Sequence, residues 1–388
     1  MKLKILFCLC LCSYLLLGQS KDSIISEAAQ VHVFKPQKVA ATPKAIKSLK
    51  LPAGFKINVF ASNLGKPRMM VVHNNQVYVS RRSGEITMLT DTNNDGKADN
   101  QKTVITKKGV HGLAIHEDTL YVITVNDVFK GSIHKDGTIG ELKTIITNLP
   151  DGGQHPNRTL AIGPDGKLYI SIGSDCNACA ETREESATLL QFDTNGKNKK
   201  IFAKGLRNTI GFDWEPKTNK LYGMDHGIDW LGDDIQKEEL NLLEEGNDYG
   251  WPYIYGKGNY NKADQPESMT YKEYSRKSTH PVMEFTAHSA PMNLLFYKGT
   301  MFPKEYQNAA FITFHGSWNR KDPKGYKVMH LRFNEGTPVK ATDFITAFLS
   351  TDGRSFFGRP VGLAELPDGS LLLSDDSNGV IYRITYSE

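Results

Sequence analysis

The chain is poor in cysteine and has no hydrophobic run long enough to span a membrane. Five cysteines occur in 388 residues, and three of them lie in the first apolar segment: Cys8, Cys10 and Cys12. This segment, from Ile5 to Gly18, has 14 residues and follows two lysines, a length and charge typical of a signal-peptide core. We therefore expect residues 1–18 to be a signal peptide and the protein to be exported to the periplasm or the cell exterior. A membrane anchor and lipid attachment at a cysteine are the alternatives.

Charge of one sign is also scarce. The net charge is +4 for the whole chain, and removal of residues 1–18 with their two lysines would leave +2. A chain so close to neutrality lacks the strongly charged surface that binds nucleic acids or anionic membranes. Neither is therefore expected as a partner.

The two cysteines beyond the first segment, Cys176 and Cys179, form a CxxC pair in SDCNACAE. Haem attachment is excluded because Ala180 stands where a histidine is required, and a zinc site lacks a second pair. A thioredoxin-like motif needs a helix start in a βαβ unit, which is not evident here. A small disulfide or an inert thiol pair is the favoured interpretation.

Helical periodicity is nearly absent, and a β-strand repeat is present instead. A polar turn followed by short apolar strands occurs six times: NNQVYVSRRSGEITML, EDTLYVITVNDVFKGSI, DGKLYISIGS, TNKLYGMDHG, NAAFITFHGSWN and DGSLLLSDDSNGVIYRI. The first four strands begin at Val77, Leu120, Leu168 and Leu221, at spacings of 43, 48 and 53 residues, close to the roughly 40 to 50 residues of a four-stranded propeller blade. The sequence therefore predicts an all-β fold, a six-bladed β-propeller, with insertions in the later blades.

The expected domain organisation follows from this repeat. Residues 19–50 are polar and contain Lys, Ala and Pro, which is typical of an extended N-terminal arm, and the propeller should occupy residues 51–388. We expect the first strand, near FKINVF, to pair with the last blade, near VIYRITY, because this closure removes exposed sheet edges.

The candidate functional residues lie in unusual segments at comparable places in successive repeats, near blade edges. These segments are GVHGLAI, GGQHPNRTL, KGLRNTIGFDWEP, MDHGIDWLGDDIQKEELN, FHGSWNRKDPKGYKV and FFGRPVGLAELPDG. Placed around one axis, they would form a pocket with several arginines and two or three histidines. Converging arginines predict a ligand with carboxylates or phosphates, because the guanidinium fork suits planar anions.

These segments resemble the pyrroloquinoline quinone (PQQ)-dependent sugar dehydrogenases, the family of the soluble glucose dehydrogenase and sorbosone dehydrogenase. The resemblance covers nearly all of residues 51–388 and rests on QHPNRTLAIGPDGKLYISIGS, GLRNTIGFDWEP, DHGIDWLGDDIQKEELN, NDYGWP, FHGSWNR and GRPVGLAELPDGSLLLSDD. It implies a six-bladed propeller, in agreement with the repeats, and an oxidoreductase that transfers hydride from a sugar to PQQ. Because no haem motif is present, electrons should pass to a separate acceptor, a quinone or a cytochrome.

The resemblance also implies roles for single residues. His155 matches the general base that takes the hydroxyl proton of the sugar, a task suited to histidine. Ser174 stands where that base has an aspartate partner in the family, so Asp175 beside it is the candidate to orient His155. Arg207 and Asn208 match the pair that binds the cofactor carboxylates. The other candidates for cofactor contact are His111, Arg158, Arg320 and Arg359.

Two calcium ions are implied as well. Gly227 and Ile228 match residues whose backbone carbonyls hold a calcium that polarises the quinone as a Lewis acid. Glu239 and Tyr249 match ligands of a second, structural calcium.

The chain departs from the glucose dehydrogenases at two further places. Ile228 replaces a proline and DWLGDD lengthens the calcium loop, so Asp233 or Asp234 is an alternative ligand. Only Arg359 stands where those enzymes have two arginines, and Arg320 is the candidate substitute. These departures favour the sorbosone-type branch.

One motif lies apart from the expected pocket. DTNNDGKADN places Asp91, Asn93, Asp95 and Asp99 around Gly96, like the first part of an EF-hand calcium loop. It lacks the glutamate at the twelfth position, and strands are expected on both sides. An Asx-rich hairpin turn is the favoured interpretation.

Two other functions are compatible with a propeller. A lactonase-type hydrolase also uses a calcium at the channel mouth, but it needs converging Asp, Glu and Asn ligands rather than several arginines. A non-catalytic binding propeller would keep the scaffold, and the presence of His155, Arg207 and Asn208 argues against it.

Overall fold

The structure is a computed structural model that describes residues 30–262 and 264–387. The expected signal peptide and the start of the expected arm lie outside the described residues. Among the residues that are described, no helix is long and apolar enough to cross a membrane.

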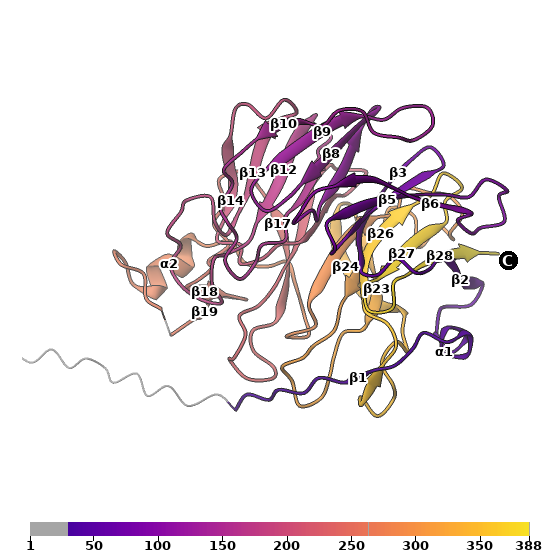
Figure 1. The fold of residues 1–388 in the computed structure, drawn as a ribbon. Coiled ribbons are helices and arrows are strands. Elements are labelled where there is room, and N and C mark those ends of the chain that lie inside the picture. Colours follow the sequence, from indigo (N-terminus) through magenta and orange to yellow (C-terminus); the bar gives the residue numbers. More distant parts are fainter. Residues whose placement is uncertain (1–29, 263, 388) are drawn as a thin grey trace, which may run out of the picture.

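Six antiparallel sheets of four strands each form the blades of a propeller (Figure 1). Blades 1 to 3 consist of β3 (Pro67–His73), β4 (Gln76–Arg81), β5 (Glu85–Thr90) and β6 (Asn100–Thr106); β7 (Leu113–His116), β8 (Thr119–Ile123), β9 (Val128–Ser132) and β10 (Lys143–Ile146); and β11 (Thr159–Ile162), β12 (Lys167–Ile172), β13 (Thr188–Asp193) and β14 (Lys200–Lys204).

Blades 4 to 6 follow the same plan. They consist of β15 (Gly211–Trp214), β16 (Leu221–Asp225), β17 (Glu238–Leu243) and β20 (Met283–Phe285); β21 (Pro291–Phe296), β22 (Ala310–Phe314), β23 (Lys327–Asn334) and β24 (Thr337–Ile345); and β26 (Pro360–Glu365), β27 (Leu371–Asp375), β28 (Val380–Tyr386) and β2 (Phe55–Ala61). The predicted six-bladed β-propeller is confirmed.

The apolar alternation of the strands explains why the blades stack. In β12, Leu168, Ile170 and Ile172 pack in a core cluster with residues of blade 2, such as Tyr121. Tyr169, which points to the other face of the same strand, packs in a cluster with blade 4. Each blade therefore buries apolar side chains on both faces, which is how period-two strands fill the space between neighbouring sheets.

The last blade is closed by the first strand of the propeller, as predicted. β2 lies antiparallel to β28, with Phe55 opposite Tyr386 and Ile57 opposite Ile384. The two ends of the propeller are thus joined in one sheet, and blade 6 has four strands like the other five.

The longest insertion interrupts blade 4, between β17 and β20. It contains the hairpin of β18 (Ile254–Tyr255) and β19 (Asn259–Tyr260) and the helix α2 (Tyr271–Lys277). Thr270 and Glu273 form a capping box that starts α2. The prediction of insertions in later blades is correct.

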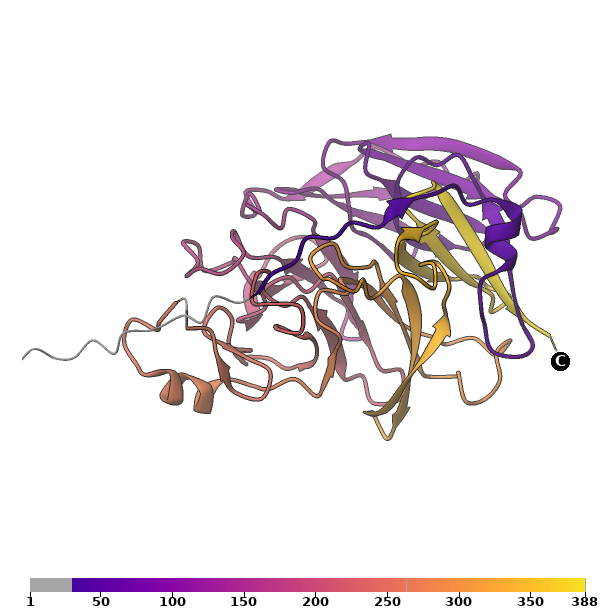
Figure 2. The same cartoon turned by 90° about the horizontal axis from the view of Figure 1, so that it is seen from below.

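Residues 30–50 run across one end of the propeller before the first blade begins (Figure 2). The strand β1 (Gln37–Lys38) pairs with β25 (Ser355–Phe356), and the helix α1 (Pro43–Lys47) follows. Phe34 N–H donates to the Trp318 carbonyl at 3.1 Å, and the His32 ring lies 3.0 Å from an Asp233 oxygen. The arm thus rests on the loops at this end.

Two smaller features have a clear structure. Cys176 and Cys179 form a disulfide. The Asp91–Asp99 segment joins β5 and β6, and Asp91 accepts hydrogen bonds from the backbone N–H groups of Asp95 and Gly96. The described residues contain no cluster of three His, Cys, Asp or Glu side chains suited to a metal ion.

Candidate functional site

The topology gathers most of the predicted site residues at one end of the propeller. The first two strands of each blade are antiparallel, so the start of the first strand lies beside the end of the second strand. In blade 3, for example, Thr159 pairs with Ser171, and in blade 6 Pro360 pairs with Asp375. Every predicted catalytic or cofactor-binding residue precedes a first strand or follows a second strand. We refer to this end as the channel mouth.

His155 has one ring nitrogen bound and the other without a partner. Its Nδ1 lies 2.9 Å from the carbonyl oxygen of Ser174 and 2.9 Å from the Ser174 hydroxyl. A carbonyl can only accept, so Nδ1 carries the proton and Nε2 keeps a lone pair. Among the described residues no group bonds to Nε2. Burial, and then the positive charge of Arg207, lower the pKa of His155 to about 4, so the imidazole is neutral at pH 7.

Asp175 is not the residue that contacts His155 in this structure. Its carboxylate accepts a hydrogen bond from Ser186 at 3.2 Å, and its backbone N–H faces Glu181. Ser174 makes the contact to the ring instead. The orienting role of Asp175 therefore stays a prediction that this geometry does not favour.

Arg158 supports the loop that carries His155. Its side chain is fully buried, and it donates to the backbone carbonyls of His155 (2.7 Å) and Pro150 (3.0 Å). Burial lowers the pKa of Arg158 to about 10, which leaves the guanidinium charged at neutral pH. In this structure the residue braces the loop.

Arg207 and Asn208 enter the site from the segment before β15. Asp225 fixes their backbone by accepting from both N–H groups, at 2.9 and 2.8 Å. The Arg207 side chain donates to Asn177 and Asp229 through Nε and Nη2, whereas no described residue bonds to Nη1. The Asn208 amide is likewise without a partner in the described chain.

Gly173 lets two of these side chains approach each other. A Cβ atom at this position would lie 2.6 Å from the Cβ of His155 and 2.9 Å from Oδ1 of Asn208. The end of β12 therefore has room for both side chains only because residue 173 is glycine.

An ion-pair network at the channel mouth was not predicted from the sequence. Arg68 donates to Asp376 at 2.6 Å, and both side chains are buried. Asp376 also contacts the His315 ring at 2.8 Å, and Arg68 lies 3.3 Å from Nε2 of His111. Despite its burial, Asp376 has a lowered pKa because His315 and Arg68 stabilise its charge. Burial and Arg68 lower the pKa of His111 to about 3.

Hydrogen bonds at the mouth cross every boundary between neighbouring blades. In order around the channel they join His315 to Asp376 (2.8 Å), Asp376 to Arg68 (2.6 Å), Arg68 to His111 (3.3 Å), His111 to the Arg158 carbonyl (3.0 Å), Asn177 to Arg207 (2.7 Å) and Asp229 to Asn319 (2.7 Å). We refer to this set as the polar ring. It ties the six blades together around the candidate site.

Arg320 and Arg359 are mainly bound to the protein itself. All three nitrogens of Arg320 are used, with Asp234 at 2.9 Å and with backbone carbonyls that include Asp322. Arg359 donates to the carbonyls of His315 and Gly316, and only its Nη1 has no partner among the described residues. The geometry therefore makes Arg320 a clamp for the 233–234 loop and leaves Arg359 one nitrogen for a ligand.

Below the polar groups the channel is closed by apolar side chains. Met69, Ile210, Met292 and Val361 form a buried cluster contributed by the first strands or the residues just before them. A small cavity of about 70 Å³ is lined by all six first strands and their approaches, including Leu113 and Leu363. The site thus has a polar mouth and an apolar floor.

These features fit PQQ, whose three carboxylates need cationic partners and whose flat rings need an apolar surface. The free nitrogens of Arg207 and Arg359, with the Asn208 amide, are suited to carboxylates. The buried charge of Arg158 adds to the positive field at the mouth, whereas that of Arg68 is balanced by Asp376.

The predicted calcium ligands lie at two different places. Gly227 and Ile228 follow β16, and their N–H groups donate to Glu238 and Gln236 at 3.0 and 3.2 Å. Their carbonyl oxygens accept no hydrogen bond within the described chain, which fits a role as metal ligands. Glu239 accepts from Gly256 N–H at 2.7 Å, whereas the Tyr249 hydroxyl bonds to Leu242 and Glu244. The second site has no such support.

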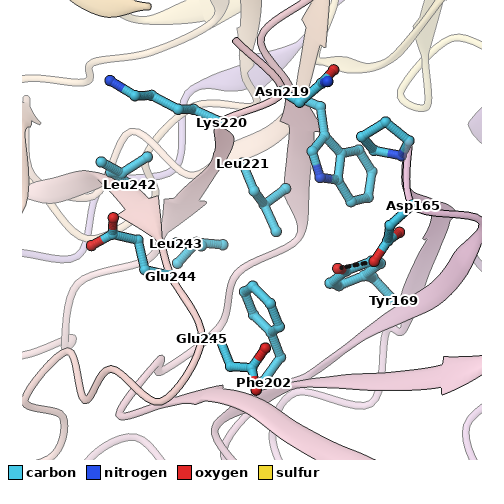
Figure 3. Close-up of a pocket in the computed structure, with 12 residues that line it drawn as sticks. Asp165, Tyr169, Phe202, Asn219, Lys220, Leu221, Leu242, Leu243, Glu244 and Glu245 are labelled. Carbon is cyan, nitrogen blue, oxygen red and sulfur yellow. Dashed lines mark hydrogen bonds between the residues drawn. The ribbon is translucent and has the colours of Figure 1, made fainter.

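Another cavity lies at the opposite end of blades 3 and 4. It has a volume of about 530 Å³ and is lined by Tyr169, Phe202 and Leu221, with Asp165 and Glu244 at its rim (Figure 3). Tyr169 donates to Asp165 at 2.9 Å. None of the predicted site residues lines this cavity.

Fold and site together define a six-bladed propeller whose channel mouth gathers several arginines around a neutral histidine. The sequence model of the family described as TrAA12-like matches residues 49–387, and the chain belongs to this family. The resemblance to the PQQ-dependent sugar dehydrogenases is confirmed.

Individual relatives agree with this assignment. An uncharacterized protein of Borreliella burgdorferi is 32% identical, over 90% of this chain and 93% of its own length. A PQQ-dependent pyranose dehydrogenase of Coprinopsis cinerea is 22% identical over 88% of this chain, which spans 55% of that enzyme. The structure of a carbohydrate-active enzyme of family AA12 from Trichoderma reesei matches with a TM-score of 0.77 at 22% identity, covering 91% of this chain and all of the other. This structural match supports the fold.

Several residues of the polar ring escaped the sequence reasoning. They are Arg68, Asn177, Asp229, His315, Asn319 and Asp376. Arg68 was recognisable in principle, because it stands at the start of a first strand, as Arg158, Arg207 and Arg359 stand just before one. The others follow second strands, in loops whose partners belong to a different blade, and local sequence carries no signal for such pairs.

Proposed function

We propose that this chain is a PQQ- and calcium-dependent dehydrogenase that oxidises an aldose or a related, sorbosone-like sugar. Membership of the family supports the class of reaction. The observation that carries the proposal for this chain is His155, whose Nδ1 is bound to Ser174 while no described residue bonds to its Nε2, and whose pKa is lowered by burial and by the charge of Arg207.

We assign the site residues to cofactor binding, calcium binding and proton transfer. Arg207, Asn208 and Arg359 would bind the carboxylates of the cofactor, while Gly227 and Ile228 would offer carbonyl oxygens to the calcium. When bound, PQQ supplies a hydride acceptor and calcium acts as a Lewis acid on it. Nε2 of His155 takes the proton of the sugar hydroxyl, and Ser174 holds the ring so that this nitrogen faces the substrate. The apolar floor excludes water from below.

The proposal includes a separate electron acceptor, a quinone or a cytochrome, because the sequence has no haem attachment motif. It also includes export, directed by residues 1–18. Amino-terminal sequencing of the protein recovered from the periplasm or medium would test the export step, and a mature chain that still begins at Met1 would contradict it.

The test of the main proposal is reconstitution. Purified apoprotein should gain a quinone absorption band on addition of PQQ and calcium, and it should then reduce an artificial dye with an aldose or with sorbosone. A lactone-hydrolysis assay on the same preparation addresses the hydrolase alternative. Dye reduction without lactone hydrolysis supports the dehydrogenase, lactone hydrolysis without PQQ supports the hydrolase, and PQQ binding without either activity supports a binding propeller.

A further inference from the structure

The turn closed by the disulfide lies between the two parts of the candidate site. Ser174 precedes Cys176 and contacts His155, and the Ser174 hydroxyl donates to the Cys176 carbonyl at 2.7 Å. Asn177 stands between the two disulfide cysteines and contacts Arg207. A single short segment, residues 174–179, therefore holds both the candidate base and the candidate carboxylate-binding arginine. We refer to it as the disulfide turn.

Asn177 contacts Arg207 and Asp229 through both its backbone carbonyl and its side-chain amide. Its backbone carbonyl accepts from Arg207 Nε at 2.9 Å, and its Oδ1 accepts from Arg207 Nη2 at 2.7 Å. The same Oδ1 accepts from Asp229 N–H at 2.9 Å, and Nδ2 donates to the Asp229 carbonyl at 3.1 Å. Both lone pairs of Oδ1 and one amide proton are used.

These contacts orient the Arg207 guanidinium by holding two of its nitrogens. Nε and Nη2 of one guanidinium are held by the same residue, which fixes the plane of the fork and leaves Nη1 as its free corner. Asp229 adds a third contact to Nη2 at 3.3 Å. Because Asn177 and Asp229 lie on different blades, the arginine is held across a blade boundary.

The disulfide keeps the turn in the shape that these contacts need. Cys176 and Ala178 pack against a buried cluster that contains Ile228 and Trp251. The sequence between the cysteines is too short to form a strand or a helix of its own. In addition to this packing and to the bond of Ser174 to the Cys176 carbonyl, the covalent closure limits the directions in which the Asn177 side chain can leave the turn.

We propose that Asn177 is a positioning residue for Arg207 and for the 227–229 loop, and that the Cys176–Cys179 disulfide holds it there. Asn177 does not touch the substrate or the reacting atoms; it acts through Arg207. The part of the proposal that concerns cofactor affinity rests on the proposed function, whereas the part that concerns the geometry of Asp229 does not.

The first test uses amide exchange and needs no cofactor. Asn177→Ala removes the acceptor of Asp229 N–H, so exchange of this amide in the apoprotein should become at least about 10-fold faster. Asn177→Asp keeps an oxygen at the same place and should retain most of the protection. The matched control is Asn195→Ala, in an exposed turn at the other end of blade 3, which should leave Asp229 unchanged. Unchanged exchange in Asn177→Ala would overturn the proposal.

The second test separates positioning from general stability. In PQQ titrations, Asn177→Ala should raise the Kd about 10-fold, the effect of one hydrogen bond to a charged group. In the background of Arg207→Ala it should raise the Kd less than about 2-fold, because Asn177 acts through that arginine. An equal effect in both backgrounds would overturn the positioning role. If the parent does not bind PQQ at all, the proposed function fails, and the exchange test still decides the role of Asn177.

The disulfide is tested by the double variant Cys176→Ser and Cys179→Ser. It should show faster Asp229 exchange and weaker PQQ binding, in the same direction as Asn177→Ala. Parental values in both measurements would overturn the role of the disulfide and leave that of Asn177 standing.

Discussion

His155, like His226 and His315 at the channel mouth, has one ring nitrogen bound to the protein and one without a partner in the described chain. Of the three, His155 is the one that the family resemblance matches to the general base. Replacing it with glutamine keeps a polar side chain and removes the base. Turnover of the reconstituted protein should fall by roughly 100- to 10,000-fold, the range for loss of a general base. The Kd for PQQ should barely change, because Arg207 and Asn208 stay in place.

Steady-state rates and cofactor titration on the same His155→Gln variant test whether His155 is the general base. Parental turnover would remove His155 from the mechanism. Lost PQQ binding would make it a structural or cofactor-holding residue instead.

Arg207 is the residue on which cofactor capture should depend most. Replacing it with alanine should weaken PQQ binding by roughly 1.5 to 3 kcal/mol, the usual value of a hydrogen bond to a charged group. The measurement is a titration of the apoprotein with PQQ. Lys200→Ala, which removes a surface cation paired with Glu245, is the control. Equal affinity in Arg207→Ala and the parent would mean that the arginines do not form the carboxylate site.

His330 provides a pH test that is independent of function. It lies in β23 against Tyr306 and Phe311, its Nε2 has no partner in the described part of the chain, and burial lowers its pKa to about 4. Below pH 6.5 the unfolded chain binds a proton that the folded protein excludes, so this residue makes the folded state less stable as pH falls from 6.5 to 4. His330→Phe should remove that loss.

The expected difference between His330→Phe and the parent is therefore pH-dependent. The variant should gain relative stability on acidification, by at most about 3 kcal/mol between pH 6.5 and 4. Urea unfolding of the two proteins at several pH values measures it. A difference that does not change with pH would contradict the argument.

At the scale of strands and loops, β2 contributes the buried aromatic side chain of Phe55 to the packing of blade 6 against blade 5. Phe55 packs edge-on against rings of blade 5 and its approach, with centroids 4.9 Å away: Phe302, Tyr306 and Phe344. Phe55→Ala should lower the free energy of unfolding by about 3 to 5 kcal/mol, the range for a buried Phe replaced by Ala.

Thermal and urea denaturation of Phe55→Ala test this prediction. The control is Val33→Ala in the arm, where the side chain is 60% exposed and the change should cost little. A loss below about 1 kcal/mol for Phe55→Ala would show that the closing strand is held by its backbone pairing alone.

Strands were easier to predict than loops, for a physical reason. The alternation in segments such as KLYISI reports burial on two faces, and the turn at Pro164–Gly166 follows from its residues, with Gly166 at φ 71°. The position of a residue within its repeat predicts the end of the channel at which it lies. It does not predict which residue a charged side chain pairs with, because contacts such as that of Arg68 with Asp376 join residues far apart in the chain. For the same reason the sequence did not show that all three nitrogens of Arg320 bond to the protein, and its contact with the cofactor stays a prediction.

At the scale of the whole molecule, the site is assembled from all six blades, so ligand binding and global stability should be coupled. A ligand that binds only the folded state stabilises it by RT ln(1 + [L]/Kd), about 2.7 kcal/mol at 100 times the Kd. PQQ with calcium should therefore raise the melting temperature of the apoprotein by several degrees.

Differential scanning calorimetry with and without PQQ and calcium measures this shift, and removal of calcium by a chelator should reverse part of it. Arg207→Ala at the same PQQ concentration should show a smaller shift. No shift in the parent at saturating PQQ would contradict a site that depends on the folded propeller, and a shift insensitive to the chelator would contradict the calcium.

The pairing of β2 with β28 also limits when the propeller can close during biosynthesis. Phe55 pairs with Tyr386, 331 residues further along the chain, and a ribosome that adds about 5 to 20 residues per second needs roughly 15 to 65 s to cover that distance. During this interval the first strand of the propeller has no neighbour to join, although the other five blades have been made. The nascent chain therefore cannot close its propeller until β28, the last strand of the described chain, has been made.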